Sequence, residues 1–223
     1  MNQNDAIFVV DPALKTCELD CFNEIMRRNP TRNFQYFAPA IFGVNDLLDT
    51  TVVPKGIIIL GSGASVDDGL AWQEPMNQWL LRQTMENTPT LGICYGHQLL
   101  AHLYGGRVAL GFDGDKKRGF REISIAEAQH GLQAGTGSVV VSHRECVVDP
   151  GQFAIVGSSE LVEIEVIAHP DKPIWGFQSH IEATPTFLKN NAIDVAHNDS
   201  SFAFGHQHVD QFICTAMSHA RTP

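Results

Sequence analysis

Short apolar runs alternate with amphipathic stretches through the first half of the chain. The runs at Ala6–Val10 and 56–60 have no polar break, which is typical of strands that helices cover on both faces. Apolar residues near helical spacing occupy 14–28 and 75–86. This alternation predicts an α/β fold with a doubly wound, mostly parallel sheet flanked by helices.

The second half of the chain has a different pattern. Strand-like segments separated by Gly, Asp or Pro occur at 107–110, 121–125, 138–142, 153–157, 162–168 and 174–179. They predict a partly antiparallel extension of the sheet. Helical pattern returns only at 185–196 and 207–220. Because no internal repeat or linker interrupts the chain, we expect residues 1–223 to form a single domain.

Composition narrows the class of protein. The chain is 43% hydrophobic and 18% charged, and its formal net charge of -10 opposes broad binding to nucleic acid. The basic run Lys116, Lys117 and Arg118, with Arg121 nearby, is interpreted as a solvated loop. Neither a signal-peptide core nor an apolar stretch of about 20 residues is present, so we expect a cytoplasmic protein without membrane contact.

Cysteine and histidine spacing does not suggest a metal site. Cys17 and Cys21 share one face of a predicted helix and are interpreted as packing residues, because no second ligand pair accompanies them. A histidine cluster near the end of the chain is interpreted as a solvated helix and loop; its members are His197, His206, His208 and His219. We therefore expect no metal and no cofactor.

The strongest chemical signal is a cysteine between two glycines. A short apolar run ends in Gly92, Ile93, Cys94, Tyr95 and Gly96 and then becomes helical in pattern. This is the strand, sharp turn and helix of a nucleophile elbow. A cysteine at a helix N-terminus is favoured as thiolate. Cysteine is also among the most commonly buried residues, so this motif alone leaves a structural role open.

A second loop is expected beside the cysteine. Ligands of open α/β sheets bind outside the carboxyl ends of the strands. The small residues 61–65, which begin with Gly61, Ser62 and Gly63, follow the apolar run at 56–60. Backbone N–H groups in such a loop can stabilise a developing oxyanion. A phosphate loop is the alternative, but the Gly-Lys-Ser/Thr ending is missing.

A cysteine nucleophile gains most from a histidine that a carboxylate orients. An acid follows two residues after a histidine in three pairs: His143 and Glu145, His169 and Asp171, His180 and Glu182. The second pair is interpreted as a surface turn. Positions i and i+2 of a strand point to one side, so His143 and His180 both remain candidates for the base.

Together these segments resemble the class I (triad) glutamine amidotransferases. Residues 92–98 are similar to the nucleophile motif of that family, 61–66 to its oxyanion loop, and 176–182 to its base segment. The three occur in the family's order within residues 6–185. Within this family, the chain is similar to the glutaminase branch of GMP synthetase.

The resemblance implies roles for individual residues. Cys94 is the implied nucleophile, His180 the catalytic histidine and Glu182 its orienting acid. The implied oxyanion donors are the backbone N–H groups of Ser62 and Tyr95. The implied substrate-binding residues are Gly61, Gln98, Ser142 and His143.

Three positions depart from the family pattern. Ile181 replaces the usual proline of the base segment, and Ser179 stands where an aromatic residue is common. Gly63 replaces a proline of the oxyanion loop, which is expected to make that loop looser.

The expected function is hydrolysis of glutamine to glutamate and ammonia through a Cys94 thioester. Because the chain to Pro223 has no room for a synthetase domain, we expect ammonia to pass to a separate synthetase subunit. One alternative is a γ-glutamyl peptide hydrolase of related fold, and another is a catalytically idle regulatory or binding module. The presence of Cys94, His180 and Glu182 favours an enzyme.

Overall fold

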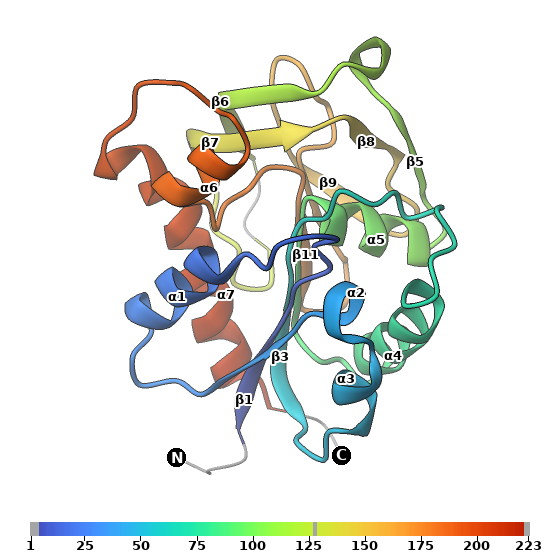
Figure 1. Ribbon diagram of the computed structural model, residues 1–223. Coiled ribbons are helices and arrows are strands. Elements are labelled where there is room, and N and C mark those ends of the chain that lie inside the picture. Colours follow the sequence, from blue (N-terminus) through green and yellow to red (C-terminus); the bar gives the residue numbers. More distant parts are fainter. Residues whose placement is uncertain (1–4, 127–128, 221–223) are drawn as a thin grey trace.

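Figure 1 shows the computed structural model, which describes residues 5–126 and 129–220. Its main sheet has nine strands in the order β2-β1-β3-β4-β11-β10-β9-β6-β7, and β5 pairs with β8 in a small second sheet. The strands are β1 Ala6–Val10, β2 Phe34–Phe37, β3 Pro54–Ile59, β4 Thr90–Ile93, β5 Arg107–Leu110, β6 Lys117–Ile125, β7 Gly135–His143, β8 Glu145–Asp149, β9 Ala154–Ser158, β10 Val166–Ala168 and β11 Ile174–Phe177. The α-helices are α1 Leu19–Arg28, α2 Pro39–Phe42, α3 Asn45–Asp49, α4 Gln73–Met85, α5 Tyr95–Leu103, α6 Pro185–Asn190 and α7 Ala203–Ser218.

The expected α/β class is confirmed. Strands β2, β1, β3, β4 and β11 are parallel neighbours. Strands β10, β9, β6 and β7 continue the sheet with antiparallel pairs. Strand β11, from the second half of the chain, pairs in parallel with β4, and Phe177 lies opposite Ile93. This pairing sets the ends of β4 and β11 beside each other.

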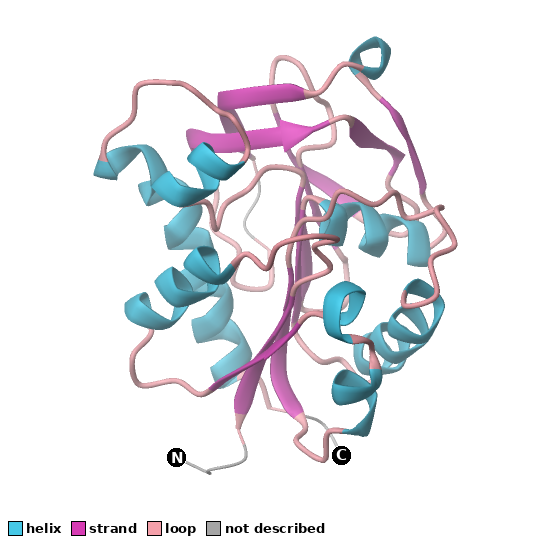
Figure 2. Ribbon diagram, in the orientation of Figure 1, coloured by secondary structure: helices cyan, strands magenta, loops and turns pink. Residues whose placement is uncertain are grey.

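Helices cover both faces of the parallel strands, as Figure 2 shows. Successive side chains of a strand point to opposite faces, and both faces of β1 are apolar. Phe8 and Val10 pack in a core with residues of α4 and α5, while Ile7 and Val9 pack in another with residues of α1 and α7. Each such side chain contributes about 1.5–3 kcal/mol when buried. Burial on both faces explains the unbroken apolar runs.

Several predicted element boundaries differ from the structure. Helix α1 begins at Leu19 rather than at residue 14, because the carboxylate of Asp11 accepts hydrogen bonds from the N–H groups of Ala13 and Glu18 and holds the intervening chain as a loop. The sequence pattern also missed α2, α3 and β8. Short helices and edge strands bury few side chains, so their periodicity is weak.

Two interpretations of polar residues were wrong. Lys117 and Arg118 lie on β6, and Arg121 is buried, so the basic run is not simply a solvated loop. In the C-terminal histidine cluster, His208 is buried on α7, and its ring packs against Phe177. In both cases a side chain with polar and apolar parts contacts a segment that is distant in the sequence. The local pattern of polar and apolar residues does not reveal such contacts.

No helix in the described part of the chain is both long and apolar enough to cross a membrane.

Candidate active site

The carboxyl ends of the parallel strands bring four segments together. Strand β1 has β2 on one side and β3 on the other, so the strand order reverses between β1 and β3, where open α/β sheets bind ligands. The segments that follow β1, β3, β4 and β11 are 11–18, 61–65, Cys94 and 178–182. The site is therefore assembled from residues far apart in the sequence.

Cys94 occupies a sharp turn between β4 and α5. Its backbone has φ 52° and ψ -101°, a conformation that costs a residue with a side chain about 1–3 kcal/mol. Hydrogen bonds fix it on both sides, since Cys94 N–H donates to Phe177 O at 2.8 Å and Cys94 O accepts from Gln98 N–H at 3.0 Å. The first N–H groups of α5 have no intrahelical acceptors. Cys94 thus has the geometry of a nucleophile elbow.

The two flanking glycines permit close packing of the turn. A Cβ at Gly92 would lie 2.4 Å from Gly96 O, and a Cβ at Gly96 would lie 2.4 Å from Ile59 O. Any side chain at either position would collide with backbone. The glycines are therefore required by the close approach of α5 to β3 and β4, while the strained backbone belongs to Cys94 itself.

His180 and Glu182 form a buried pair. His180 Nδ1 lies 2.9 Å from Glu182 Oε1, and the side chains are only 6% and 1% exposed. The expectation that they extend along a strand was wrong, because β11 ends at Phe177 and His180 N–H donates instead to Val140 O of β7 at 2.7 Å. The ring of Phe187 packs against the imidazole, with centroids 4.4 Å apart.

The protonation of His180 depends on its two acidic neighbours. Burial alone disfavours the charged imidazolium, but the negative charges of Glu182 and Cys94, together with hydrogen bonds to both, outweigh burial and raise the pKa of His180 to about 10. We conclude that His180 is an imidazolium near neutral pH.

His143 has a different environment. Its Nδ1 lies 3.1 Å from the backbone oxygen of Glu145, not from that residue's carboxylate, and its Nε2 lies 3.3 Å from Arg121 Nη1. Burial and then the charge of Arg121 lower the pKa of His143 to about 4. His143 is therefore neutral near pH 7, with Nδ1 donating to the carbonyl.

The third candidate pair also lacks a carboxylate contact. His169 Nδ1 accepts a hydrogen bond from Asp171 N–H at 3.1 Å, and its ring packs against Tyr104 and Phe153. Among the three pairs, only His180 is in contact with the carboxylate of its acidic partner.

Gly61 lies where Cys94 and His180 approach each other. A Cβ at this position would be 2.6 Å from His180 Cε1 and 3.6 Å from Cys94 Cβ. The loop is anchored despite Gly63, because Ser62 Oγ donates to Pro12 O at 2.7 Å and accepts from Ala64 N–H at 3.1 Å. The structure therefore brings the Gly61 loop, the thiol and the imidazole to one point.

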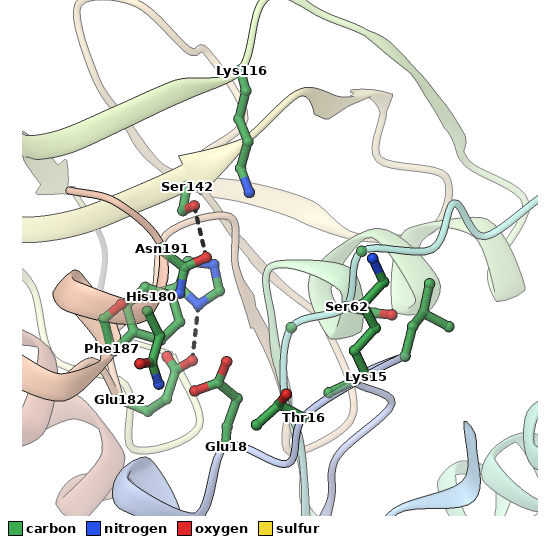
Figure 3. A pocket seen from close by; sticks show the side chains of 15 residues that line it. Lys15, Thr16, Glu18, Ser62, Lys116, Ser142, His180, Glu182, Phe187 and Asn191 are labelled. Carbon is green, nitrogen blue, oxygen red and sulfur yellow. Dashed lines mark hydrogen bonds and ion pairs between the residues drawn. The ribbon is translucent and has the colours of Figure 1, made fainter. Parts of the chain in front are cut away.

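Two cavities open beside this point. The thiol cavity, of about 320 Å³, is lined by Cys94, Gln98 and His143 among others. The imidazole cavity, of about 650 Å³, is lined by Gly61, His180 and Glu182 among others (Figure 3). Both cavities share a wall made of Ser62, Gly63, Lys116 and Ser142.

The remaining predicted residues lie around these cavities. Gln98 Nε2 donates to Glu145 O at 2.9 Å, the same carbonyl that contacts His143. Ser142 Oγ donates to Asn191 Oδ1 at 3.3 Å. Tyr95 begins α5, and its hydroxyl accepts from Gln73 Nε2 at 3.0 Å away from the cavities. Its side chain is thus structural, and only its backbone is placed toward the turn.

Sequence reasoning missed part of the cavity lining. Lys116 lines both cavities, and Lys15, Thr16, Glu18 and Asn191 line the imidazole cavity. The available signal was the position of 11–18 directly after β1, at the expected ligand-binding edge. Within the described residues, no group of three or more His, Cys, Asp or Glu is arranged to hold a metal ion.

Comparison with known proteins identifies the family. Residues 30–196 match the family model described as Glutamine amidotransferase class-I. The chain is 29% identical over 172 residues to a subunit of the glutamine-hydrolyzing GMP synthase of Methanopyrus kandleri, covering 72% of this chain and 88% of that protein. It is 34% identical over 153 residues to the protein of the same name from Methanosarcina acetivorans, covering 66% and 74%.

Solved structures agree on the fold. A glutamine amidotransferase from Thermotoga maritima superposes with a TM-score of 0.76 at 16% identity, covering 98% of this chain and 100% of that chain. A protein from Thermoplasma acidophilum, described as a GMP synthase subunit, gives a TM-score of 0.70 at 21% identity, covering 96% and 94%. The chain belongs to the class I glutamine amidotransferase family, and the expectation of an enzyme of this type is confirmed.

Proposed function

We propose that the chain hydrolyses the side-chain amide of glutamine with Cys94 as nucleophile, His180 as acid and base, and Glu182 as the group that orients His180. The observation that carries this proposal is the buried His180–Glu182 contact of 2.9 Å beside the strained Cys94 turn. A nucleophile, a base and an orienting carboxylate are the parts that acyl transfer requires.

In the first half-reaction, the Cys94 thiolate attacks the amide carbon and forms a C–S bond. The backbone N–H groups of Ser62 and Tyr95 stabilise the resulting oxyanion. The C–N bond then breaks as the imidazolium of His180 gives its proton to the departing ammonia. In the second half-reaction, His180 takes a proton from water, the water oxygen adds to the thioester carbon, and the C–S bond breaks to release glutamate.

The environments of His180 and His143 support this assignment of the base. An imidazolium that transfers a proton to ammonia must be protonated when the thiolate attacks, which fits the raised pKa of His180. His143 is held neutral, and its Nε2 is occupied by Arg121. An imidazole that is neutral near pH 7 and whose Nε2 contacts a guanidinium rather than the nucleophile is suited to shape a pocket rather than to protonate a leaving group.

The thiol cavity is the proposed glutamine pocket. The proposed substrate-binding residues are Gln98, Ser142 and His143, which line this cavity, and Gly61, which lines the neighbouring imidazole cavity. Gln98 and His143 both contact Glu145 O, so one carbonyl fixes two walls of the pocket. Asp68 and Lys116 also line this cavity and offer opposite charges to the α-ammonium and α-carboxylate groups of an amino acid.

The names of the relatives support a proposal for the destination of the ammonia. Two of them are named as one subunit of a glutamine-hydrolyzing GMP synthase, and we extend to this chain the delivery of ammonia to a separate synthetase subunit. A single domain over residues 1–223 and a cytoplasmic location also remain predictions.

A covalent label tests the nucleophile. A diazo-ketone analogue of glutamine should add once, at Cys94, because the pocket presents the glutamyl group to this thiol. Cys146, which lies 3.6 Å from His143 Nδ1, is the internal control for a thiol beside a histidine. Mass spectrometry of peptides from wild type and Cys94→Ser locates the adduct. Labelling of Cys146, or of Cys94→Ser at another residue, would contradict the proposal.

A further inference from the structure

The imidazole cavity beside His180 is larger than a departing ammonia molecule needs. Each water-sized molecule occupies about 30 Å³ in a liquid, whereas the imidazole cavity measures about 650 Å³ and is larger than the thiol cavity of about 320 Å³. Pockets of about 300–1,000 Å³ are typical of sites for small organic ligands. Release of ammonia alone does not account for a cavity of this size beside the base.

The position of the cavity assigns it to the departing group. In the proposed mechanism the leaving nitrogen takes its proton from His180, so it leaves on the imidazole side. His180 lines the imidazole cavity but not the thiol cavity, and Cys94 lines the thiol cavity but not the imidazole cavity. The shared wall of Ser62, Gly63, Lys116 and Ser142 spans both. A bound amide therefore places its acyl part in one cavity and its amine part in the other.

The lining of the imidazole cavity suits an amino acid. Lys15 and Glu18 belong to one loop after β1 and offer a cation and a carboxylate, and Figure 3 shows Lys116 reaching in from the opposite side. The side chains of Lys15 and Glu18 make no hydrogen bond or ion pair with the residues that the structure describes, so both are available to a ligand. Leu14, 42% exposed at the wall, adds an apolar contact.

The surroundings of Glu18 also change the pKa of its carboxyl group. Burial raises its pKa to about 7, with the negative charges of Glu182 and Asp11 acting in the same direction, Asp20 adding a smaller effect, and His180 opposing it. A cationic amine in the cavity would offset this concentration of carboxylates. The released amine becomes an ammonium ion in water, and Glu18 is placed to receive it.

We infer that the enzyme also cleaves γ-glutamyl peptides, in which the leaving amine is that of an amino acid held in the imidazole cavity. The inference rests on the proposed Cys94 mechanism. The C–S bond forms and the γ-amide C–N bond breaks as His180 protonates the peptide nitrogen, and water then releases glutamate from the thioester. The α-carboxylate of the leaving amino acid pairs with Lys15, and its amine lies beside Glu18.

Turnover of two substrates tests the inference. Glutamine and γ-glutamyl-alanine are incubated with wild type and Cys94→Ser, and glutamate, ammonia and alanine are quantified by mass spectrometry or enzymatic assay. Release of alanine by wild type alone, with a kcat/KM at least equal to that for glutamine, supports the inference. Hydrolysis of glutamine without hydrolysis of γ-glutamyl-alanine overturns the inference and leaves the proposed function standing. Hydrolysis of neither overturns both.

A charge reversal locates the amino-acid site. Lys15→Glu should lower the ratio of kcat/KM for γ-glutamyl-alanine to that for glutamine about tenfold, because an exposed ion pair is replaced by repulsion. Lys55→Glu makes the same charge change near the amino end of β3, outside both cavities, and is the matched control. With γ-glutamyl-alanine amide, whose carboxylate is blocked, the effect of Lys15→Glu should disappear. An equal fall in the kcat/KM ratio for Lys15→Glu and Lys55→Glu would refute the placement of the α-carboxylate beside Lys15.

Discussion

Arg121 Nη1 lies 2.7 Å from Glu165 Oε1 in the protein interior, with the two side chains 7% and 0% exposed. The same guanidinium nitrogen lies 3.3 Å from Nε2 of His143, and Ser159 Oγ donates to the same Glu165 oxygen at 2.8 Å. Strands β6, β7 and the segment before β10 are thus joined behind the thiol cavity. The pair supports the wall that carries His143.

Breaking this pair should destabilise the fold. Glu165→Gln keeps the shape of the side chain but leaves Arg121 charged and uncompensated, and loss of one partner of a buried pair costs about 3–5 kcal/mol. Urea unfolding of the variant measures this loss. The double variant Arg121→Met with Glu165→Gln should recover part of it, because no buried charge remains. A loss below about 1 kcal/mol would show that water compensates the charge.

His180 and His143 should differ in kinetic effect. His180→Ala removes the proposed acid and base and should lower kcat for glutamine by about 10²–10⁴-fold. His143→Ala changes the wall of the substrate pocket and should mainly raise KM. Steady-state ammonia release, measured with both variants, compares them. The reverse pattern, with kcat lost in His143→Ala, would mean that the wrong histidine is assigned.

Gly61→Ala should impair catalysis without unfolding the protein. The added Cβ would lie 2.6 Å from His180 Cε1, so the imidazole must move, and a displacement of about 1 Å can cost about a hundredfold in rate. Gly63→Ala, in the same loop, is the matched control, since its Cβ has Leu14 Cδ1 at 3.9 Å as nearest neighbour. The measurement is kcat alongside the melting temperature. Similar kcat in both variants would argue against close contact at Gly61.

The raised pKa of His180 predicts a pH-dependent contribution to stability. Its folded pKa, about 10, lies above the ordinary histidine value of 6.5. The stabilisation from its positive charge is therefore fully present below pH 6.5 and is lost as pH rises toward 10. Unfolding free energies of wild type and Glu182→Gln, measured between about pH 6 and pH 10, should converge with rising pH, because Glu182 is the largest charge that raises this pKa.

NMR provides an independent check of both histidines. The ring signals of His180 should remain those of imidazolium at about pH 8, while those of His143, whose pKa lies near 4, should remain neutral down to about pH 5. A midpoint near 6.5 for either ring would contradict the charge environments described for that residue.

The local sequence pattern determined the strands that are buried on both faces and the sharp turn at Cys94. The runs of β1 and β3 are apolar throughout because helices cover them on both sides, and this holds whatever their partners are. Gly92 and Gly96 specified a tight turn around Cys94, because a Cβ at either glycine would lie 2.4 Å from a backbone oxygen. The α/β class, the antiparallel extension and the candidate nucleophile were therefore accessible from sequence.

Tertiary structure decided which polar side chains meet. His143 and His180 each precede a glutamate by two residues, yet only His180 contacts the carboxylate, because the chain leaves β11 at Phe177 and bonds to Val140. Lys116 and Glu18 line a cavity whose other walls come from segments remote in sequence, and Arg121 is buried beside Glu165. The periodicity of apolar side chains indicates which face of a single helix or strand is buried. The separation and charge of groups on different elements arise only when the strands are placed in register.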